Sequence, residues 1–363
     1  MDACSADFAR TESLPLPHHD ARKEACSAPT KACRVLFTPE FAIFLVISAL
    51  AATWVHVDYR SRTDGATWER VAWWLGTLLA LPIFLPIYLI AARPTGRLVR
   101  CPSCGRLTVA HRAACRHCGS AIAFEPPLTM WGLGEVVGIG VVFMFAIPVV
   151  ASALGLGLSP SLGEVAVFAL VQNGAFIGLS LYVVRRRYGL PAAELGVRLD
   201  RWPSWAVGGL IAGALSIPVS MQAEEAAIVI IGYFTGRARA EAMAEQEHLA
   251  DVLTSILQGP LTTAQLILIF ALVCVLVPIG EELFFRGFVF TTLRRWGVAL
   301  ASVLSALFFA AVHEQVVHFL PIFLLGVILA LLYQRTRSLL LSIVVHAANN
   351  VVAILGVLYN WKL

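Results

Sequence analysis

An apolar run with three ionisable side chains inside it constrains this chain more than any other stretch. Residues 266–277 carry no charge and lead directly into residues 278–290, which contain Glu281, Glu282 and Arg286. The combined run is long enough to span a membrane, yet each charge near the centre of a span costs about 2.5–3.5 kcal/mol. Charged residues persist there when they face a protein interior or a wet cavity. The run therefore predicts a functional site inside a helical membrane protein.

The spacing of the three ionisable residues divides their roles. Glu282 and Arg286 are four residues apart, so on a helix they can form an ion pair. Glu281 projects about 100° away from Glu282 around the helix axis. We therefore predict that the Glu282–Arg286 pair braces the site and that Glu281 faces it.

The composition indicates an all-α polytopic membrane protein. Hydrophobic residues make up 58% of the 363 residues, charged residues 14%, and the mean hydropathy is +0.78. The net charge of +4 comes from arginines in loops beside the apolar runs, which argues against a nucleic-acid partner and for the lipid bilayer. We expect about nine transmembrane helices, near residues 41–57, 71–92, 130–156, 165–184, 205–233, 266–295, 298–312, 319–333 and 339–358.

Four segments are expected along the chain. They are a flexible polar tail (1–38), a transmembrane hairpin (39–93), a zinc-ribbon-like loop (94–127) and a helical core (128–363). A long, largely acidic loop is expected between residues 233 and 263. The loops rich in arginine are 93–127, 185–201, 294–295 and 335–337, and the positive-inside rule assigns them to the cytoplasm. The prediction is a multi-pass protein of the cell membrane, with the amino-terminal tail and the zinc-ribbon loop both cytoplasmic.

Four cysteines predict a structural zinc site. Cys101 and Cys104 form one CxxC pair, and Cys115 and Cys118 form a second pair ten residues later. Two such turns supply the four thiolates of a tetrahedral Zn²⁺. Four thiolates leave no open coordination position, so this zinc is not expected to be catalytic. The loop could instead dock a protein partner or be stiffened by its metal.

Further polar residues lie in the last third of the chain. Phe309 and His313 end one predicted span, while His346 and Asn350 are four apart on one face of the last span. His313 and His318 are five apart, about 140° around a helix, so this stretch does not match a HExxH metalloprotease motif. Glu314 and His318 could line the mouth of the site. Glu224 and Glu225 are expected near a membrane face.

These motifs together resemble a known family. EExxxR at Glu281–Arg286, FxxxH at Phe309–His313 and HxxxN at His346–Asn350 occur in the order found in CPBP intramembrane metalloproteases. That family includes type II CAAX prenyl endopeptidases and abortive-infection-like proteins. The resemblance covers about residues 130–363, and residues 323–326 resemble a minor third motif.

The resemblance implies an intramembrane endopeptidase, with Glu281, His313, His346 and Asn350 at the catalytic positions. Glu281 could deprotonate a water, with Asn350 and a histidine stabilising the oxyanion. Alternatively, His313 and His346 could hold a catalytic divalent metal whose water Glu281 deprotonates. The implied substrate is a membrane-embedded or lipidated, CAAX-like peptide or protein. A non-catalytic membrane scaffold or immunity protein, or a proton-coupled carrier, remain alternatives.

Overall fold

The computed structural model describes residues 39–110, 112–123, 131–153, 161–198, 201–250 and 252–359. The predicted flexible tail, 1–38, lies outside the described residues. The chain divides into two compact units, Met1–Leu50 and Ala51–Leu363. The described part of the first unit is the opening half of helix α2. The second unit contains the rest of α2 and all later elements.

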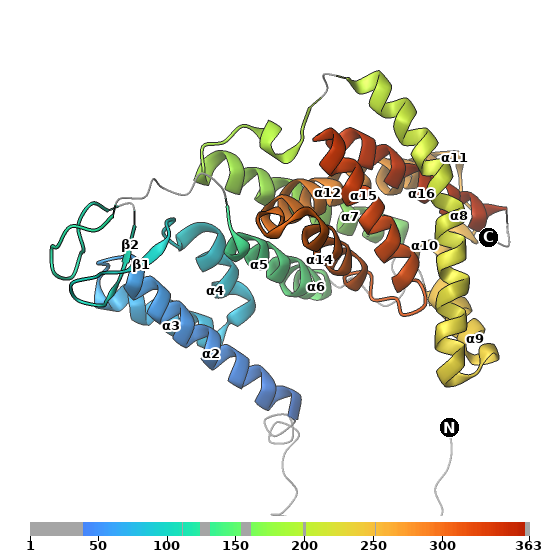
Figure 1. The fold of residues 1–363 in the computed structure, drawn as a ribbon. Coiled ribbons are helices and arrows are strands. Elements are labelled where there is room, and N and C mark those ends of the chain that lie inside the picture. The colour runs from blue at the N-terminus through green and yellow to red at the C-terminus, as the bar shows by residue number, and fades with distance from the viewer. Residues whose placement is uncertain are drawn as a thin grey trace, which may run out of the picture. The chain divides into compact units, whose positions relative to one another are not determined.

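The described chain is mostly helical (Figure 1). The amino-terminal part contains α2 (Pro39–Arg62), α3 (Thr67–Leu79), α4 (Leu81–Ile87), η2 (Tyr88–Ala92) and the antiparallel strands β1 (Leu98–Arg100) and β2 (Leu107–Val109). The middle contains α5 (Leu133–Val141), η3 (Val142–Ala146), α6 (Ile147–Ala153), α7 (Leu162–Leu181), η4 (Tyr182–Arg187), η5 (Ala192–Leu195), α8 (Trp202–Thr235), α9 (Arg237–Ala250) and α10 (Val252–Leu257). The last part contains α11 (Thr263–Ala271), η6 (Leu272–Leu276), α12 (Val277–Glu282), η7 (Leu283–Phe290), α13 (Thr291–Leu293), η8 (Arg294–Trp296), α14 (Val298–Ala311), α15 (Phe319–Thr336) and α16 (Leu339–Leu358).

Seven of the described helical segments are long and apolar enough to cross a membrane, which confirms the polytopic helical fold class. They are Ile43–Arg62, Leu133–Ser152, Leu162–Arg187, Trp202–Thr235, Thr263–Trp296, Phe319–Thr336 and Leu339–Leu358. Two shorter apolar helices, Leu81–Ala92 and Val298–Ala311, bring the apolar helices to nine. The motif segment is a single span of 34 residues, Thr263–Trp296.

The second predicted span, residues 71–92, is instead a helical hairpin. The helix breaks at Ala80, after α3, and resumes in α4, where Pro82 occupies the first turn. Proline lacks a backbone N–H and its ring clashes with the carbonyl four residues back, so Pro82 is tolerated in the first turn of a new helix but not inside a continuous one. Trp73 of α3 packs edge-on against Phe84 of α4, with ring centroids 6.2 Å apart. The chain therefore turns back on itself where one straight helix was expected.

The expected acidic loop between residues 233 and 263 is also largely helical. Helix α8 continues to Thr235, and α9 and α10 follow. The sequence of α9, RARAEAMAEQEHLA, is polar but consists almost entirely of strong helix formers. The expectation of a loop was wrong because it followed polarity, whereas alanine, glutamate, glutamine and arginine favour a helix whether or not it is buried.

Aromatic stacking fixes the motif helix in the bundle. The ring of Phe176 in α7 stacks on Phe284 of η7 at 4.5 Å and on Phe143 of η3 at 4.4 Å. Trp131 stacks on Phe288 at 5.0 Å, and its indole Nε1 donates to the Phe288 carbonyl oxygen at 3.2 Å. Such rings bury a large apolar area and add a preferred geometry. In Figure 1, α12 lies among α7, α14 and α16. Helices α7 and α16 contact α12 itself, and α14 contacts η7, which continues α12.

Small residues let α8 and α16 pack closely. A Cβ atom at Gly209 would lie 2.6 Å from Val344, and one at Gly213 would lie 2.7 Å from Ala348. Membrane helices commonly use such small residues to bring backbones together. The close approach places Ser216 of α8 beside Asn349 of α16, whose Nδ2 donates to the serine Oγ at 2.8 Å.

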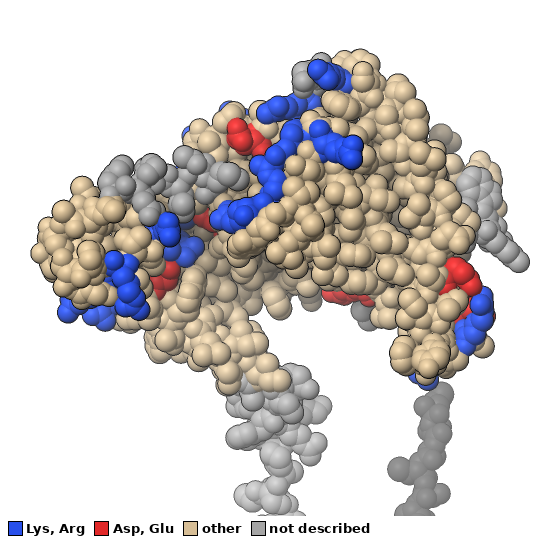
Figure 2. All heavy atoms as spheres, viewed as in Figure 1, with Lys and Arg blue, Asp and Glu red and all other residues tan. Residues whose placement is uncertain are grey.

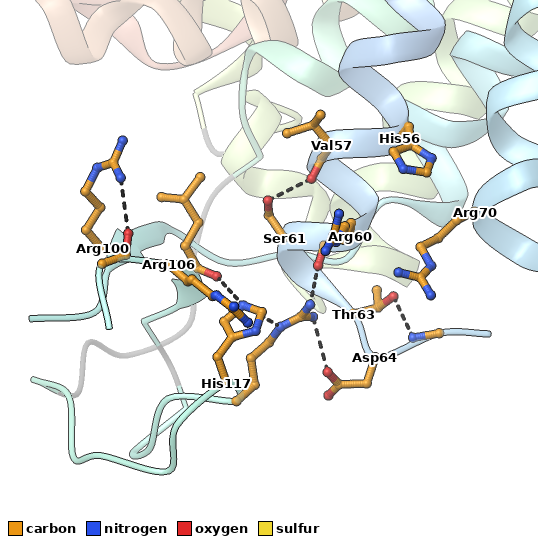
Figure 3. A pocket seen from close by; sticks show the side chains of 14 residues that line it. His56, Val57, Arg60, Ser61, Thr63, Asp64, Arg70, Arg100, Arg106 and His117 are labelled. Carbon is orange, nitrogen blue, oxygen red and sulfur yellow. Dashed lines mark hydrogen bonds and ion pairs between the residues drawn. The ribbon is translucent and has the colours of Figure 1, made fainter. Parts of the chain in front are cut away.

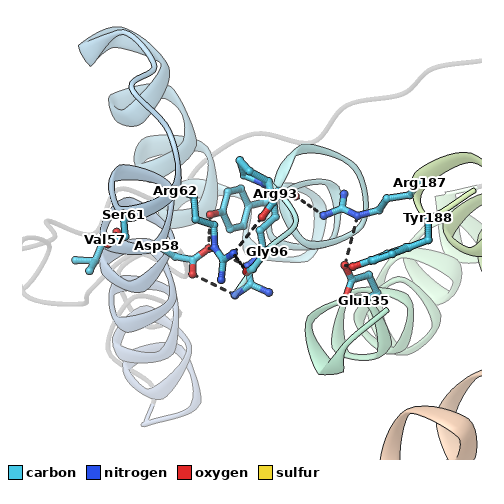
Figure 4. Close-up of polar contacts among 11 residues, drawn as sticks. Val57, Asp58, Ser61, Arg62, Arg93, Gly96, Glu135, Arg187 and Tyr188 are labelled. Atoms are coloured by element: carbon cyan, nitrogen blue, oxygen red, sulfur yellow. Dashed lines mark hydrogen bonds and ion pairs between the residues drawn. The ribbon is translucent and has the colours of Figure 1, made fainter. Parts of the chain in front are cut away.

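A buried aspartate joins α2 to the start of the cysteine-containing segment (Figure 4). Asp58 Oδ2 accepts hydrogen bonds from Arg62 Nε at 2.9 Å, Arg93 Nε at 2.8 Å and Tyr88 Oη at 2.7 Å. The side chain of Asp58 is 6% exposed. Arg62 also donates to the carbonyl oxygen of Gly96 at 2.7 Å. One carboxylate therefore holds together the end of α2, the end of η2 and the first residues of the strand segment.

A second arginine links this part to the bundle. Arg187 donates from Nη1 to the Ile90 carbonyl oxygen at 2.7 Å and from Nη2 to that of Arg93. Its Nε lies 3.3 Å from Glu135, whose carboxylate also accepts from the hydroxyl of Tyr188 at 2.8 Å (Figure 4) and from the Gly132 backbone nitrogen at 2.9 Å. The predicted arginine-rich loops 93–127 and 185–201 therefore meet at one place.

The arginine-rich segments 185–201 and 335–337 also meet. Ser338 Oγ donates to the Arg198 carbonyl oxygen at 3.2 Å, and Leu339 N donates to that of Gly196 at 2.9 Å. Gly196 has φ +84°, and a Cβ there would lie 2.5 Å from the Tyr333 ring, so glycine is needed. Figure 2 shows basic side chains as a band across the part of the bundle that carries the 185–201 connection.

We predict that Asp58→Asn destabilises the protein by about 3–5 kcal/mol, because it leaves the buried Arg62 and Arg93 without their carboxylate. Asp64→Asn is the control, because Asp64 is 67% exposed and such ion pairs contribute at most about 1 kcal/mol. The measurement is denaturant unfolding of the purified proteins. Equal stability of the two variants would contradict the central role of Asp58.

Candidate functional site

The two glutamates of the motif lie where α12 packs tightly against α7. A Cβ at Gly280 would lie 2.4 Å from Asn173 Oδ1, so the two helices touch at this glycine. The next residues, Glu281 and Glu282, are 9% and 0% exposed. Close packing at Gly280 therefore carries the two carboxylates into the interior of the helical bundle.

Glu282 is shared between an arginine and a histidine. Its Oε1 accepts from Arg286 Nη1 at 2.8 Å and contacts His346 Nδ1 of α16 at 3.0 Å. Arg286, which is 1% exposed, also donates from Nη2 to the Gly326 carbonyl oxygen of α15 at 3.3 Å. The i, i+4 ion pair predicted from the sequence is present. It also orients His346, in the way that a carboxylate fixes a catalytic or metal-binding imidazole.

Glu281 presents a carboxylate oxygen with no hydrogen bond. Its Oε2 is buried and has no hydrogen-bond partner in the described structure. The nearby His346 Nε2 is 3.8 Å from this oxygen, beyond hydrogen-bond length. The two ring nitrogens of His346 thus face two different glutamates. An orphan buried acceptor of this kind is costly unless water or a substrate group satisfies it.

Phe309 of α14 forms one wall of the site. The guanidinium of Arg286 lies over its ring, 4.4 Å from the centroid. The imidazoles of His346 and His313 contact the same ring edge-on, with centroids 5.8 Å and 4.8 Å away. The phenylalanine of the FxxxH pattern therefore touches three of the predicted site residues.

His313 and Asn350 lie at the edges of this group. His313 follows the end of α14, is partly buried, and its Nδ1 lies 2.7 Å from the Phe309 carbonyl oxygen. Asn350 Nδ2 donates to the Val273 carbonyl oxygen of η6 at 2.8 Å, which ties α16 to the motif span. One N–H of the Asn350 amide is therefore used for this helix contact.

The arrangement of these side chains bears on a catalytic metal. Among the described residues, the four cysteines are the one set of three or more His, Cys, Asp or Glu side chains close enough to share an ion. Glu281, His313 and His346 do not form such a set in this arrangement. A catalytic metal on His313 and His346 stays a prediction.

The four cysteines fit a zinc ion. Their Sγ atoms all lie within 4.8 Å of one another, with Cys101–Cys118 and Cys104–Cys115 separations of 3.7 Å. Tetrahedral Zn²⁺ with Zn–S bonds of about 2.3 Å places its sulfurs about 3.8 Å apart, whereas a disulfide joins them at about 2.05 Å.

Glu247 is a site residue that the sequence reasoning missed. This α9 carboxylate accepts from the backbone nitrogens of Val316, Val317 and His318, the shortest at 2.7 Å. Its Oε2 also lies 2.8 Å from His318 Nδ1. A carboxylate at a helix N-terminus complements the helix dipole, so Glu247 fixes the start of α15. No local pattern in the sequence reveals Glu247, because its partners lie far from it in the chain and meet it only in the tertiary structure.

The two histidines of the HExxxH stretch have different partners. His313 bonds the Phe309 carbonyl, while His318 contacts Glu247 and lies 3.7 Å from Glu224 Oε1. Glu225, beside Glu224 in α8, is half exposed and pairs with Arg237 at 2.9 Å. The two histidines therefore face different groups in this structure, and the prediction that this stretch is not a HExxH zinc motif stays a prediction.

Asn173 was also missed by the sequence reasoning. Its Nδ2 donates to the Ala169 carbonyl oxygen at 3.0 Å, but its buried Oδ1 has no hydrogen bond in the described structure. This oxygen faces Gly280, immediately before the two glutamates. The available signal was an asparagine within an apolar span, a residue type that commonly joins helices.

Comparison with known proteins supports both the family resemblance of the helical core and the zinc-ribbon prediction. Residues 263–352 match the type II CAAX prenyl endopeptidase Rce1-like family. The chain carries an Rce1-like domain. Residues 91–125 match the ChsH2 rubredoxin-like zinc ribbon domain, which together with the cysteine geometry indicates a structural zinc.

One curated protein is a distant relative. An uncharacterized 24.3 kDa protein of Escherichia coli is 26% identical over 175 residues, which cover 46% of this chain and 70% of the relative. No solved structure matches the chain. The Rce1-like match includes Glu281, Glu282, Arg286, His313, His346 and Asn350 within its bounds. It does not by itself assign their roles.

We predict that Cys101→Ser/Cys104→Ser removes one zinc per chain, because two of the four thiolates are lost. The measurement is elemental analysis of the purified protein. Cys274→Ser is the matched control, because Cys274 is a buried cysteine of the motif span, away from the cluster. Unchanged zinc in the double variant would contradict the assignment of metal to the ribbon.

The contact between His318 and Glu247 predicts a pH-dependent stability. Burial lowers the pKa of His318, but its bonds to Glu224 and Glu247 outweigh burial and raise it above 6.5. Burial raises the pKa of Glu247, but hydrogen bonds from Val317 and His318 outweigh it and hold that pKa below 4.5. The protonated histidine contributes its full stabilisation of the folded state below pH 6.5, and this contribution is lost as the pH rises through its raised pKa. The glutamate contributes fully above 4.5 and less as the pH falls through its lowered pKa.

We therefore expect the stability lost in His318→Gln to be largest between pH 4.5 and 6.5 and to shrink on either side. Thermal unfolding of both proteins across pH 4–8 measures it. Glu245→Gln serves as the control, because Glu245 is an exposed residue of α9, the helix that carries Glu247. A difference that is constant with pH would show that the contact is not an ion pair.

Proposed function

We propose that this protein is an intramembrane endopeptidase that hydrolyses a peptide bond of a membrane-embedded or lipidated substrate. The observation that carries the proposal is Glu281 Oε2, a buried carboxylate oxygen without a hydrogen bond beside the anchored His346. The Rce1-like match over residues 263–352 supports a peptidase. Both point to chemistry at the same place in the fold.

The proposed reaction begins with a water bound at Glu281. A carboxylate in a poorly solvated interior is a stronger base than in water, so Glu281 accepts a proton from this water. The hydroxide adds to the scissile carbonyl carbon, and Glu281 then returns the proton to the leaving nitrogen as the C–N bond breaks. Water adds across the peptide bond, and the glutamate ends as it began.

The oxyanion of the tetrahedral intermediate needs donors that are already in place. His346 Nε2 can donate to the oxyanion only in the doubly protonated imidazolium form, because the Nδ1–H already donates to Glu282 at 3.0 Å. Asn350 is a second proposed donor through the amide N–H that does not bond Val273. Glu282 and Arg286 are positioning residues, because they hold the imidazole and are themselves 0% and 1% exposed.

A metal held by His313 and His346 is the second mechanism for the same reaction. Catalytic zinc sites usually have three protein ligands, and these side chains are not gathered as a ligand set in this structure. A metal there would polarise the scissile carbonyl or supply a bound water. Metal content therefore distinguishes the two mechanisms without changing the proposed activity.

We propose a cell-membrane location with the zinc ribbon on the cytoplasmic side. The arginine-rich loops that the positive-inside rule assigns to one side do lie together, through Arg187 and Ser338. Helix α2 is one continuous helix of 24 residues that ends at the ribbon side, at Arg62.

We predict that Glu281→Gln lowers peptide cleavage by about 10²–10⁴-fold, the usual contribution of a general base. The assay uses the full chain in lipid nanodiscs with a farnesylated CAAX peptide and a pool of transmembrane peptides, with products identified by mass spectrometry. Glu225→Gln is the control, because Glu225 is an exposed glutamate of a neighbouring helix. Retained cleavage in Glu281→Gln would overturn the proposal.

The same preparation tests the two mechanisms by its metal content. One zinc per chain in both the wild type and His313→Ala/His346→Ala would assign all metal to the ribbon and favour a metal-free glutamate. A second metal that disappears in the double variant would favour the metal mechanism. The wild type could cleave no peptide while Glu281→Gln keeps the biological effect of the protein. That result would favour a non-catalytic scaffold. Proton-coupled uptake of a solute into vesicles would instead indicate a carrier.

A further inference from the structure

A basic pocket lies between the zinc ribbon and the end of α2, away from the glutamate site (Figure 3). Its volume is about 580 Å³, and its lining includes five arginines and one carboxylate. The charged lining residues are Arg60, Arg70, Arg100, Arg106, Arg116 and Asp64. Two histidines, His56 and His117, face the same space. The positive charge is therefore far from balanced by protein groups.

One of these arginines is buried with a donor left over. The side chain of Arg116 is 7% exposed. Its Nη2 donates to the Arg60 carbonyl oxygen, but its buried Nη1 has no hydrogen bond in the described structure. This Nη1 lies 3.4 Å from Asp64, whose own side chain is 67% exposed. A buried cationic donor facing a cavity without a hydrogen-bonded partner is costly, and a bound anion would remove that cost.

The remaining arginines leave further donors for a ligand. Arg70 donates from Nη2 to Thr67 at 2.9 Å, but its buried Nε has no hydrogen bond in the described structure. Arg100 uses Nη1 for the Gly105 carbonyl oxygen at 3.1 Å. Arg106 is exposed at the rim of the pocket. Arginines of α2, α3 and the ribbon line the same pocket, and a guanidinium with free donors suits a tetrahedral oxyanion because its planar fork can offer two parallel N–H bonds.

The position of the pocket in the chain points to the membrane surface. The candidate span Ile43–Arg62 ends among the lining residues. Trp54 on this helix is 44% exposed, and Trp68, just beyond the pocket, is 70% exposed. Exposed tryptophans are typical of the headgroup level of a bilayer. A phosphate at this depth is available both from lipid headgroups and from the aqueous phase.

We propose that this pocket binds a phosphate group, held by arginines of α2, α3 and the zinc ribbon. The ribbon then has a ligand of its own, because Arg100, Arg106 and Arg116 of the ribbon all line this pocket. This inference does not depend on peptidase activity, because none of its residues belongs to the glutamate site.

The first experiment compares lipids. The full chain is extracted from bilayers of equal phosphatidylglycerol and phosphatidylcholine, and retained lipids are counted by native mass spectrometry. We expect phosphatidylglycerol to be retained preferentially. Arg100→Gln/Arg106→Gln should lower this preference about tenfold or more, since each basic residue beside an anionic headgroup contributes roughly fivefold. Both arginines are exposed, and an unchanged zinc content confirms that the ribbon is folded.

The second experiment separates the two sources of phosphate. The protein in phosphatidylcholine nanodiscs is heated with and without millimolar inorganic phosphate. A rise in Tm that Arg100→Gln/Arg106→Gln abolishes would identify free phosphate as a ligand. An unchanged Tm together with preferential retention of phosphatidylglycerol would identify the lipid headgroup.

The control is Arg185→Gln/Arg186→Gln, which removes two exposed arginines of η4 outside the pocket. It should leave both measurements unchanged. An equal loss in this control would show diffuse attraction to anionic lipid and would overturn the proposal. The absence of both lipid preference and phosphate stabilisation in the wild type would overturn it as well.

Discussion

The interaction on which the candidate site depends is the sharing of one Glu282 oxygen between Arg286 and His346, at 2.8 Å and 3.0 Å. Neither the glutamate nor the arginine is more than 1% exposed. A buried charge without a partner costs several kcal/mol, so the three groups stabilise the bundle only as a set. Glu282 and Arg286 belong to the motif span and His346 belongs to α16. The contact between Glu282 and His346 therefore fixes α16 against the motif span.

The surrounding bundle keeps this set in place by close packing rather than by further charges. Gly280 brings α12 against Asn173 of α7, and Gly213 brings α8 against Ala348 of α16. Phe309 then closes the group with its ring against Arg286 and His346. Among the described residues, the buried Glu281 Oε2 has no hydrogen bond, although Glu282 Oε2 and Arg286 Nε beside it also lack one.

The zinc ribbon is attached to this bundle by the same kind of interaction. Asp58 gathers Arg62 and Arg93, and Arg187 connects that cluster to Glu135 of the bundle. Backbone carbonyls at the end of η2 take the remaining arginine donors. Buried ion pairs therefore fix the ribbon to the membrane helices. The basic pocket is lined by residues of the same elements, α2 and the ribbon, but not by Asp58, Arg62, Arg93 or Arg187.

Much of this protein was determined by its sequence. The apolar runs predicted the places of seven of the nine expected spans, which are long and apolar enough to cross a membrane, because in a bilayer the backbone groups must be satisfied within a helix. Local spacing fixed the Glu282–Arg286 pair and the four-cysteine site, since each depends on residues a few positions apart. The tertiary structure decided the rest: which imidazole Glu282 would orient, that Glu247 would cap α15, that residues 71–92 would fold back as a hairpin, and that five arginines would converge on one pocket. These contacts join residues far apart in the chain, so only the packing of the helices could bring them together.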